Sequence, residues 1–261
     1  MELFARYDSL RLRTYQSCEH LYERIGVEAI GPATALRFDD VGYFNRVYAP
    51  SAAVSKHVEA IERFYRGCPF ACELVGPPLG LSAAVEAECR SRGWVEGREY
   101  AWVGGPVPAP STDILVACGF SIRSPGPEER AAFLSCYLRA FEAEPVRFEA
   151  AMRNMRHLFS RPELSFLMAW REGRPAGVGM LYREGRLAIL CAGATLPDER
   201  RSGCHAALLE ARFVLAAELG CNEIYSWALL GGQSHINMER AGLATLGVTR
   251  AWVFNPAPDR A

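Results

Sequence analysis

The sequence lacks both a hydrophobic run long enough to cross a membrane and an excess of charge of either sign. No apolar stretch approaches the ~20 residues of a membrane-spanning helix, and the N-terminal "MELFARYDSLRLRTYQ" has no continuous apolar segment. The 29 lysines and arginines balance the 30 aspartates and glutamates to a net charge of -1, which argues against nucleic acid or an anionic membrane as a main partner. We therefore expect a soluble, cytoplasmic protein with no nucleic-acid or membrane partner.

A cysteine pattern is also missing. The nine cysteines are odd in number and several lie inside apolar segments, as Cys191 does in "LAILCAG", so buried reduced thiols are a better interpretation than a disulfide framework. Cys68 and Cys72 come closest to a ligand pair, but no second pair stands at a matching distance, and we predict no metal site. No base partner is visible for Cys191 or Cys204, so we interpret both as buried rather than nucleophilic.

The length and composition indicate two domains. The chain has 261 residues, half of them hydrophobic, which is enough for more than one core. The clearest boundary is "GGPVPAPST", Gly104 to Thr112, whose glycines and prolines disfavour a regular hydrogen-bond ladder and predict an extended linker. We place the domains at residues 1–110 and 111–261.

The two halves end alike. The first closes with "ECRSRGWVEGREYAWV" and the second with "NMERAGLATLGVTRAWVF": in each, a helix tail and a glycine precede a strand ending in Ala-Trp-Val. The preceding segments predict the order β-α-β-α-β in both halves, which begins in the first half with a strand "YFNRVYA", Tyr43 to Ala49. We interpret the chain as two copies of one α/β domain, each with a mixed central sheet flanked by helices.

The second half has the more complete pattern. Three strands are predicted at 165–170, 175–182 and 187–194, joined by two "REGR" turns whose Glu-Gly pairs favour hairpins. Upstream, residues 126–141 and 145–159 predict two helices separated by a break at "EAEP".

One loop in this half indicates an anion site. After the strand 187–194, "LPDERRSGCHAALLEARFVLAAELG" turns at Pro197 and starts a long apolar helix at Gly203. The first-turn N–H groups of a helix have no internal partner and carry the positive end of its dipole, and Arg200 and Arg201 would strengthen the attraction for an anion. Gly203 has no Cβ to block the approach of a phosphate, so the loop suits a pyrophosphate.

The same loop resembles a known motif. "LPDERRSGCHAALL" is similar to the acyl-CoA-binding motif of the GNAT superfamily of N-acetyltransferases, Gln/Arg-x-x-Gly-x-Gly/Ala, with Arg200 and Gly203 on the pattern and His205 where the family prefers glycine or alanine. The resemblance implies acetyl-CoA as co-substrate, with its pantothenate in a splayed gap between the strands 187–194 and 223–228. It implies this set of cofactor-binding residues: Ala194, Thr195, Leu196, Arg200, Arg201, Ser202, Gly203, Cys204, His205, Asn237 and Arg240.

The first half has no such loop. "VYAPSAAVSKHVE" joins strand to helix with no glycine and no arginine pair. The chain therefore resembles a tandem GNAT protein with a degenerate N-terminal copy, which we expect to shape the acceptor cleft. Tyr43, Asn45 and Arg46 are its exposed candidate residues, and a structural role for them is equally compatible with the sequence.

The general acid and base are less evident. Amine acylation needs a neutral amine, a donor for the developing oxyanion and a proton for the departing thiolate. Met238 stands where the family often has a tyrosine that acts as the general acid. The candidate catalytic residues are Glu144 in the helix break, whose neighbour Glu142 is a lesser candidate, and His235 and Ser234 on the short helix "SHINMERAG". A surface role for Glu144 and a capping role for His235 are the alternatives.

Two functions remain open at this level. The first is an N-acyltransferase that moves an acetyl or other short acyl group from acyl-CoA to the primary amine of a small molecule. The second is a catalytically weak acyl-CoA-binding or protein-interaction module, which the missing tyrosine and the unusual His205 favour. The sequence does not indicate the acceptor, the acyl chain length or the oligomeric state.

Overall fold

The computed structural model describes residues 1–18, 24–109 and 119–256. The chain forms two compact units. The first comprises Met1–Trp102, Trp227–Gly232 and Thr245–Ala261, and the second comprises Val103–Ser226 and Gln233–Ala244. The predicted boundary near residue 110 falls outside the described residues and stays a prediction.

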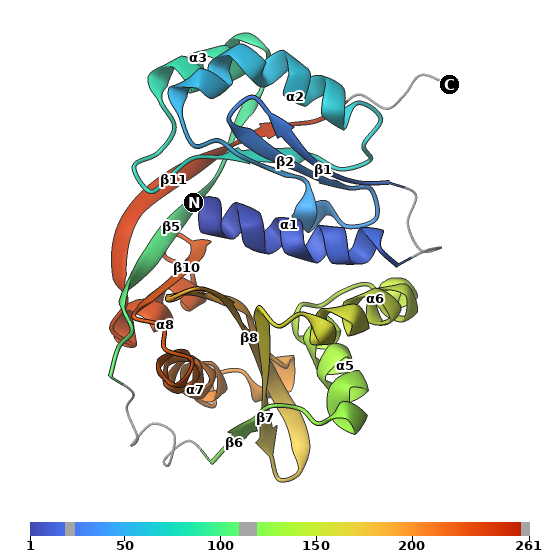
Figure 1. The fold of residues 1–261 in the computed structure, drawn as a ribbon, viewed down its shortest axis with the longest axis vertical. Helices are drawn as coiled ribbons and strands as arrows, with labels where there is room; N and C mark the ends of the chain where they lie inside the picture. Colours follow the sequence, from blue (N-terminus) through green and yellow to red (C-terminus); the bar gives the residue numbers. More distant parts are fainter. Residues whose placement is uncertain (19–23, 110–118, 257–261) are drawn as a thin grey trace. The chain divides into compact units, whose positions relative to one another are not determined.

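The first unit is a mixed sheet with helices on both faces (Figure 1). Its strands are β1 (Ile25–Ile30), β2 (Ala33–Phe38), β3 (Arg46–Tyr48), β4 (Cys72–Val75), part of β5 (Val95–Pro106) and most of β11 (Ala244–Phe254). The spatial order is β1-β2-β3-β4-β11-β5, in which β3 and β4 pair parallel while β1–β2, β2–β3 and β4–β11 pair antiparallel.

Alternation along these strands separates two cores. Ala35, Val47 and Leu74 belong to the cluster under α2 (Val58–Tyr65) and α3 (Ala83–Ser91), because successive side chains of a strand point to opposite faces. On the other face, the hydroxyl of Tyr48 donates to Asp8 of α1 (Glu2–Gln16), which runs along the sheet (Figure 1).

The second unit is also a mixed sheet between helices. Its strands are β6 (Ser121–Arg123), β7 (Leu164–Arg171), β8 (Arg174–Glu184), β9 (Leu187–Thr195) and the first part of β10 (Glu223–Leu229). They lie in the order β10-β9-β8-β7-β6, with β10 parallel to β9 and the others antiparallel. Its helices are α5 (Arg130–Ala140), α6 (Phe148–Met155), α7 (Cys204–Glu218) and α8 (Gln233–Arg240). Figure 1 shows α7 and α5 on opposite sides of β7 and β8.

Most elements predicted from the sequence are confirmed. The three strands of the second half, the two hairpin turns, the helix break and the start of α7 directly after Gly203 are all present. The turn at Glu172 and Gly173 has positive φ at both residues, as a tight hairpin requires. The mixed α/β fold with a central sheet flanked by helices is likewise confirmed. That the two halves are copies of one domain stays a prediction.

Three expectations for the first half were wrong. The segment Gly104–Pro106 belongs to β5 rather than to a linker: a Cβ on Gly104 would lie 2.8 Å from the Ile224 carbonyl oxygen, so glycine permits a close approach of two strands there. Asn45 and Arg46, expected to be exposed, are buried, and of that group only Tyr43 is exposed. The amide of Asn45 bonds the backbone of Phe38 in both directions, which requires burial of this side chain. The strand expected from Tyr43 begins at Arg46.

Candidate functional site

The loop between β9 and α7 has the backbone shape of an anion cradle. A short 3-10 turn, Pro197–Glu199, leads to Arg201 at φ 62° and Gly203 at φ 89°, both in the left-handed region. Arg201 adopts this conformation at a cost of about 1–2 kcal/mol because it carries a Cβ. Gly203 is the N-cap of α7 and supplies no side-chain acceptor, so the first-turn N–H groups of a 15-residue helix are left for another partner.

The two arginines of the loop are in different situations. Arg200 pairs with Glu142 from the break between α5 and α6, with 2.5 Å between Nη2 and Oε1. Arg201 is exposed and has no carboxylate within ion-pair distance among the residues that the structure describes. Ser202 donates to the Glu199 carbonyl at 2.5 Å and fixes the turn. The loop therefore presents one unpaired guanidinium and one that is held by an exposed carboxylate.

His205 and Asn237, predicted for the same site, lie together. The Asn237 amide oxygen accepts from Gln233 at 2.8 Å, which leaves Nδ2 to donate to His205 Nδ1 at 3.2 Å. This network assigns His205 the neutral tautomer with its proton on Nε2. Burial, and then the charge of Arg212, lower the pKa of His205 from 6.5 to about 4. His205, the second residue of α7, is therefore uncharged near neutral pH and has its Nε2–H as a hydrogen-bond donor.

The pKa of His205 predicts a pH dependence of stability. The folded imidazole binds its proton near pH 4 and the unfolded one near pH 6.5. In this window the unfolded state binds more protons, so the free energy of unfolding is expected to fall by up to about 3 kcal/mol as the pH drops through it. Urea unfolding of the protein and of His205→Asn across the window measures this loss as a difference between the two profiles. Parallel profiles would contradict the prediction.

The edge of β9 beside this loop is only partly paired. The backbone ladder between β9 and β10 runs from Leu187–Glu223 to Ile189–Tyr225 and ends there, although β9 continues to Thr195. The Leu196 N–H donates to the Ala176 carbonyl of β8 at 2.9 Å. Because bonding directions alternate along an antiparallel strand, Ala194 and Leu196 bond towards β8 and Thr195 directs its backbone groups away from it. Thr195 Oγ1 is buried without a hydrogen-bond partner.

The predicted acid and base candidates are held within their own helices or loops. His235 is buried, with Nε2 3.5 Å from Glu239 Oε1 one turn later in α8. Glu144 is exposed and pairs with Arg147 at 3.3 Å. Ser234 and Arg240 are exposed, at the first turn and the last residue of α8. Met238 is on the buried side of α8, at 2% exposure.

Arg212 is a residue that the sequence reasoning did not select. It stands in the apolar helix α7, its side chain is fully buried, and its Nε donates to the Leu208 carbonyl at 2.9 Å. Burial lowers the pKa of its guanidinium from 12.5 to about 10. An arginine within a mostly apolar helix was the available signal, but the sequence alone does not show which side of α7 is buried.

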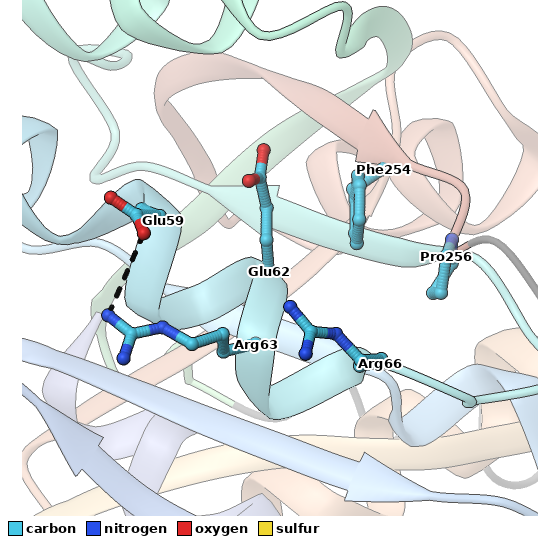
Figure 2. Close-up of a pocket in the computed structure, with 6 residues that line it drawn as sticks. All are labelled: Glu59, Glu62, Arg63, Arg66, Phe254 and Pro256. Atoms are coloured by element: carbon cyan, nitrogen blue, oxygen red, sulfur yellow. Dashed lines mark ion pairs between the residues drawn. The ribbon is translucent and has the colours of Figure 1, made fainter. Parts of the chain in front are cut away.

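The cysteines and a surface pocket offer no alternative site. Cys191 and Cys204 are buried, as predicted, and none of the eight described cysteines is part of a disulfide. No group of three metal-ligating side chains occurs among residues 1–18, 24–109 and 119–256. Within the same residues no helix is long and apolar enough to cross a membrane. A pocket in the first unit, lined by charged side chains of α2 and by Phe254 and Pro256 (Figure 2), contains none of the predicted site residues.

Part of the second unit, including this loop, matches a known family model. Residues 130–240 match the model of the acetyltransferase (GNAT) family. No curated protein sequence matches the chain. Among solved structures, a GCN5-related N-acetyltransferase from Kribbella flavida is similar, with a TM-score of 0.61, 17% identity and coverage of 97% of this chain and 95% of that chain.

Two further structures share the fold. One is a GNAT-family putative acetyltransferase from Novosphingobium aromaticivorans, with a TM-score of 0.56, 19% identity and coverage of 88% and 91% of the two chains. The other is a tandem GNAT protein from the clavulanic acid biosynthesis pathway, with a TM-score of 0.53, 14% identity and coverage of 80% and 70%. At these identities the similarity is one of fold.

Proposed function

We propose, from the GNAT acetyltransferase domain at residues 130–240, that the protein is an N-acyltransferase that moves an acetyl or other short acyl group from acyl-CoA to the primary amine of a small molecule. The observation that carries the proposal is the uncapped start of α7 at Gly203, with Arg201 beside it and the unpaired edge of β9 leading to it. A domain of this family generally transfers acyl groups from acyl-CoA.

The residues of the site fit the cofactor. The first-turn N–H groups of α7 and the guanidinium of Arg201 suit the pyrophosphate, in a turn that the Ser202 hydroxyl fixes through the Glu199 carbonyl. The neutral Nε2–H of His205 adds a donor that carries no charge. Thr195 offers outward backbone groups and an unpartnered buried hydroxyl to the amides of the pantetheine arm. When bound, the cofactor supplies an activated acyl thioester.

Charged and polar side chains of the second unit suit the amine acceptor and its proton. Glu144 is exposed in the break between α5 and α6, and its carboxylate is suited to attract a cationic amine and to accept its proton. His235 is a candidate proton carrier through its contact with Glu239, and the exposed hydroxyl of Ser234 precedes it in α8. Arg240 closes the same helix. These roles are part of the proposal.

Titration of the full-length protein with acetyl-CoA in a calorimeter tests the proposal, followed by release of free thiol in the presence of a panel of primary amines. Binding together with amine-dependent thiol release supports it. A folded protein that neither binds acetyl-CoA nor releases thiol would contradict it.

A second candidate function is a catalytically weak acyl-CoA-binding module. The specific observation in its favour is Met238, which fills a buried position where the family often has a tyrosine acid. A thioether donates no proton. Tight acetyl-CoA binding with no turnover over the amine panel would favour this candidate over the transferase.

The Arg200–Glu142 pair gives a testable consequence for affinity. The carboxylate competes with the pyrophosphate for Arg200, so Glu142→Gln is expected to strengthen acetyl-CoA binding about two- to fivefold, the equivalent of an exposed ion pair. Glu149→Gln is the matched control, because Glu149 forms a similar exposed pair with Arg153 on α6. Calorimetry that finds weaker binding in Glu142→Gln, or the same gain in the control, would show that no such competition exists.

A further inference from the structure

Arg212 differs from the other buried arginines of the described chain. Arg37 pairs with both carboxylate oxygens of Asp39 at 2.6 and 2.7 Å, Arg46 pairs with Glu73 at 3.0 Å, and Arg11 lies 3.6 Å from Asp8. Arg212 has no carboxylate within ion-pair distance among the described residues, and donates only to the carbonyls of Leu208 and Cys191. A buried cation without a counter-charge costs stability. The pKa of Arg212 falls while Asp39 raises that of Arg37 against the effect of its burial.

The guanidinium fills a hollow that two glycines leave in the sheet. A Cβ on Gly193 would lie 2.9 Å from Arg212 Nη2, and one on Gly179 would lie 3.0 Å from its Nε. The side chain therefore requires the absence of both Cβ atoms. Arg212 Nη1 also donates to the carbonyl of Cys191 at 3.4 Å. Cys191 pairs with Met180 and is the last β9 residue that pairs with β8 before the irregularity.

This hollow lies under a bulge of β9. Val178 pairs with Ala194 and Met180 with Cys191, so Ala192 and Gly193 together face Gly179 alone. Ala192 has φ 50°, in the left-handed region that a residue with a Cβ rarely adopts. Arg212 contacts this irregular backbone from beneath, at the carbonyl of Cys191 and at Gly193.

The bulge lies where the reacting end of the cofactor would be. Thr195 is two to three residues from Ala192 and Gly193, or roughly 7–10 Å along a strand. An arm that starts at the Gly203 loop and follows the edge of β9 through Thr195 therefore brings its thioester towards the bulge. In the transfer, the amine nitrogen bonds to the carbonyl carbon, the carbon–sulfur bond breaks, the amine loses a proton and the thiolate gains one. Negative charge develops on the carbonyl oxygen in the transition state, near the buried cation.

We propose that Arg212 is a positioning residue for acyl transfer, which holds the Ala192–Gly193 bulge and fixes a positive charge behind the place of the thioester carbonyl. The inference rests on the proposed function. It explains why a cation that pairs with no carboxylate of the described chain stands under an irregular segment of β9. The gain is a positive charge that is already in place in a low-dielectric environment when the transition state forms. The cost is a lower folding stability.

The test compares Arg212→Met with the wild-type protein, using full-length chains. Methionine fills much of the same space without charge, so the melting temperature is expected to stay the same or rise. The affinity for acetyl-CoA should stay within about threefold, while kcat for thiol release falls by about tenfold or more. Arg212→Lys should recover part of kcat because it restores the charge. Leu215→Met, on the same helix, is the control for a change of packing in α7.

Several results would overturn the inference. A lower melting temperature with kcat within about twofold of wild type would make Arg212 a purely structural residue. Unchanged acetyl transfer with loss of succinyl transfer, measured with succinyl-CoA, would make it a determinant of acyl specificity. Wild-type protein that binds no acetyl-CoA would remove the proposed function and this inference together. Because that last result is seen in the wild-type protein, it is distinct from a failure of Arg212 alone.

Discussion

Gly203→Asp is expected to weaken acetyl-CoA binding by at least a thousandfold, or about 4 kcal/mol. Three effects act in the same direction. A Cβ at the N-cap obstructs the approach of a phosphate to the first-turn amides, and the new carboxylate is a local acceptor for those same N–H groups. Its charge also repels the pyrophosphate at short distance. The measurement is calorimetric titration of folded protein, with circular dichroism to establish that the fold is retained.

The matched control for this variant is Gly220→Asp. Gly220 follows the other end of α7, has φ 73° and has no atom within 4 Å of the place of a Cβ, so both changes impose the same left-handed strain on an aspartate. Each is expected to cost about 1–2 kcal/mol of stability. Only Gly203→Asp should lose acetyl-CoA binding. Equal affinities in the two variants would show that the loop at Gly203 does not hold the cofactor.

Glu73→Ala is expected to destabilise the first unit by about 3–5 kcal/mol. Glu73 accepts from Arg46 at 3.0 Å and from the Tyr100 hydroxyl at 2.9 Å, and Arg46 is buried with its guanidinium 4.4 Å from the Trp227 ring centroid. Removal of the carboxylate takes from the buried guanidinium the anion with which it forms its 3.0 Å ion pair. If the Arg46 side chain moved out to solvent instead, it would lose its contact with the Trp227 ring. Urea unfolding followed by tryptophan fluorescence measures the loss.

Glu59→Ala is the control for this second effect. Glu59 pairs with Arg63 at 4.0 Å on the outer surface of α2, and both side chains are more than 60% exposed (Figure 2). The same chemical change there is expected to cost less than about 1 kcal/mol, because water already solvates both charges. If the two variants unfold at the same urea concentration, the Arg46–Glu73 pair does not stabilise the fold as its burial indicates.

Much of the second unit was predictable because its signals are local. The hairpins at Glu172–Gly173 and Gly185–Arg186, the break near Glu142 and the helix start after Gly203 each follow from a few adjacent residues. Glycine at a left-handed position and a helix start without a side-chain cap are properties of the chain within one turn. The elements of the first half were harder to predict, because β3 and β4 are short and residues 52–57 form a 3-10 helix. In addition, Arg46 is buried although an arginine is usually exposed.

Side-chain partners from distant segments were not predictable. Arg200 and Glu142 are 58 residues apart, and nothing near either one indicates the pair. The lowered pKa of His205 depends on its burial and on Arg212, and the neutral tautomer depends on Asn237 in α8. Each of these facts needs a distance between residues that are far apart in the chain.

The sequence by itself determined the order of strands and helices in the second unit, the glycine before α7 and the resemblance of this segment to a known motif. The tertiary structure alone decided that Arg212 lies under the β9 bulge, with no carboxylate of the described residues within ion-pair distance. It also decided that most of β11 belongs to the first unit although it follows the second unit in the sequence. The physical reason is the range of the interactions: backbone conformation and helix capping act within a few residues, whereas burial, ion pairing and sheet assembly depend on the packing of segments that only folding brings together.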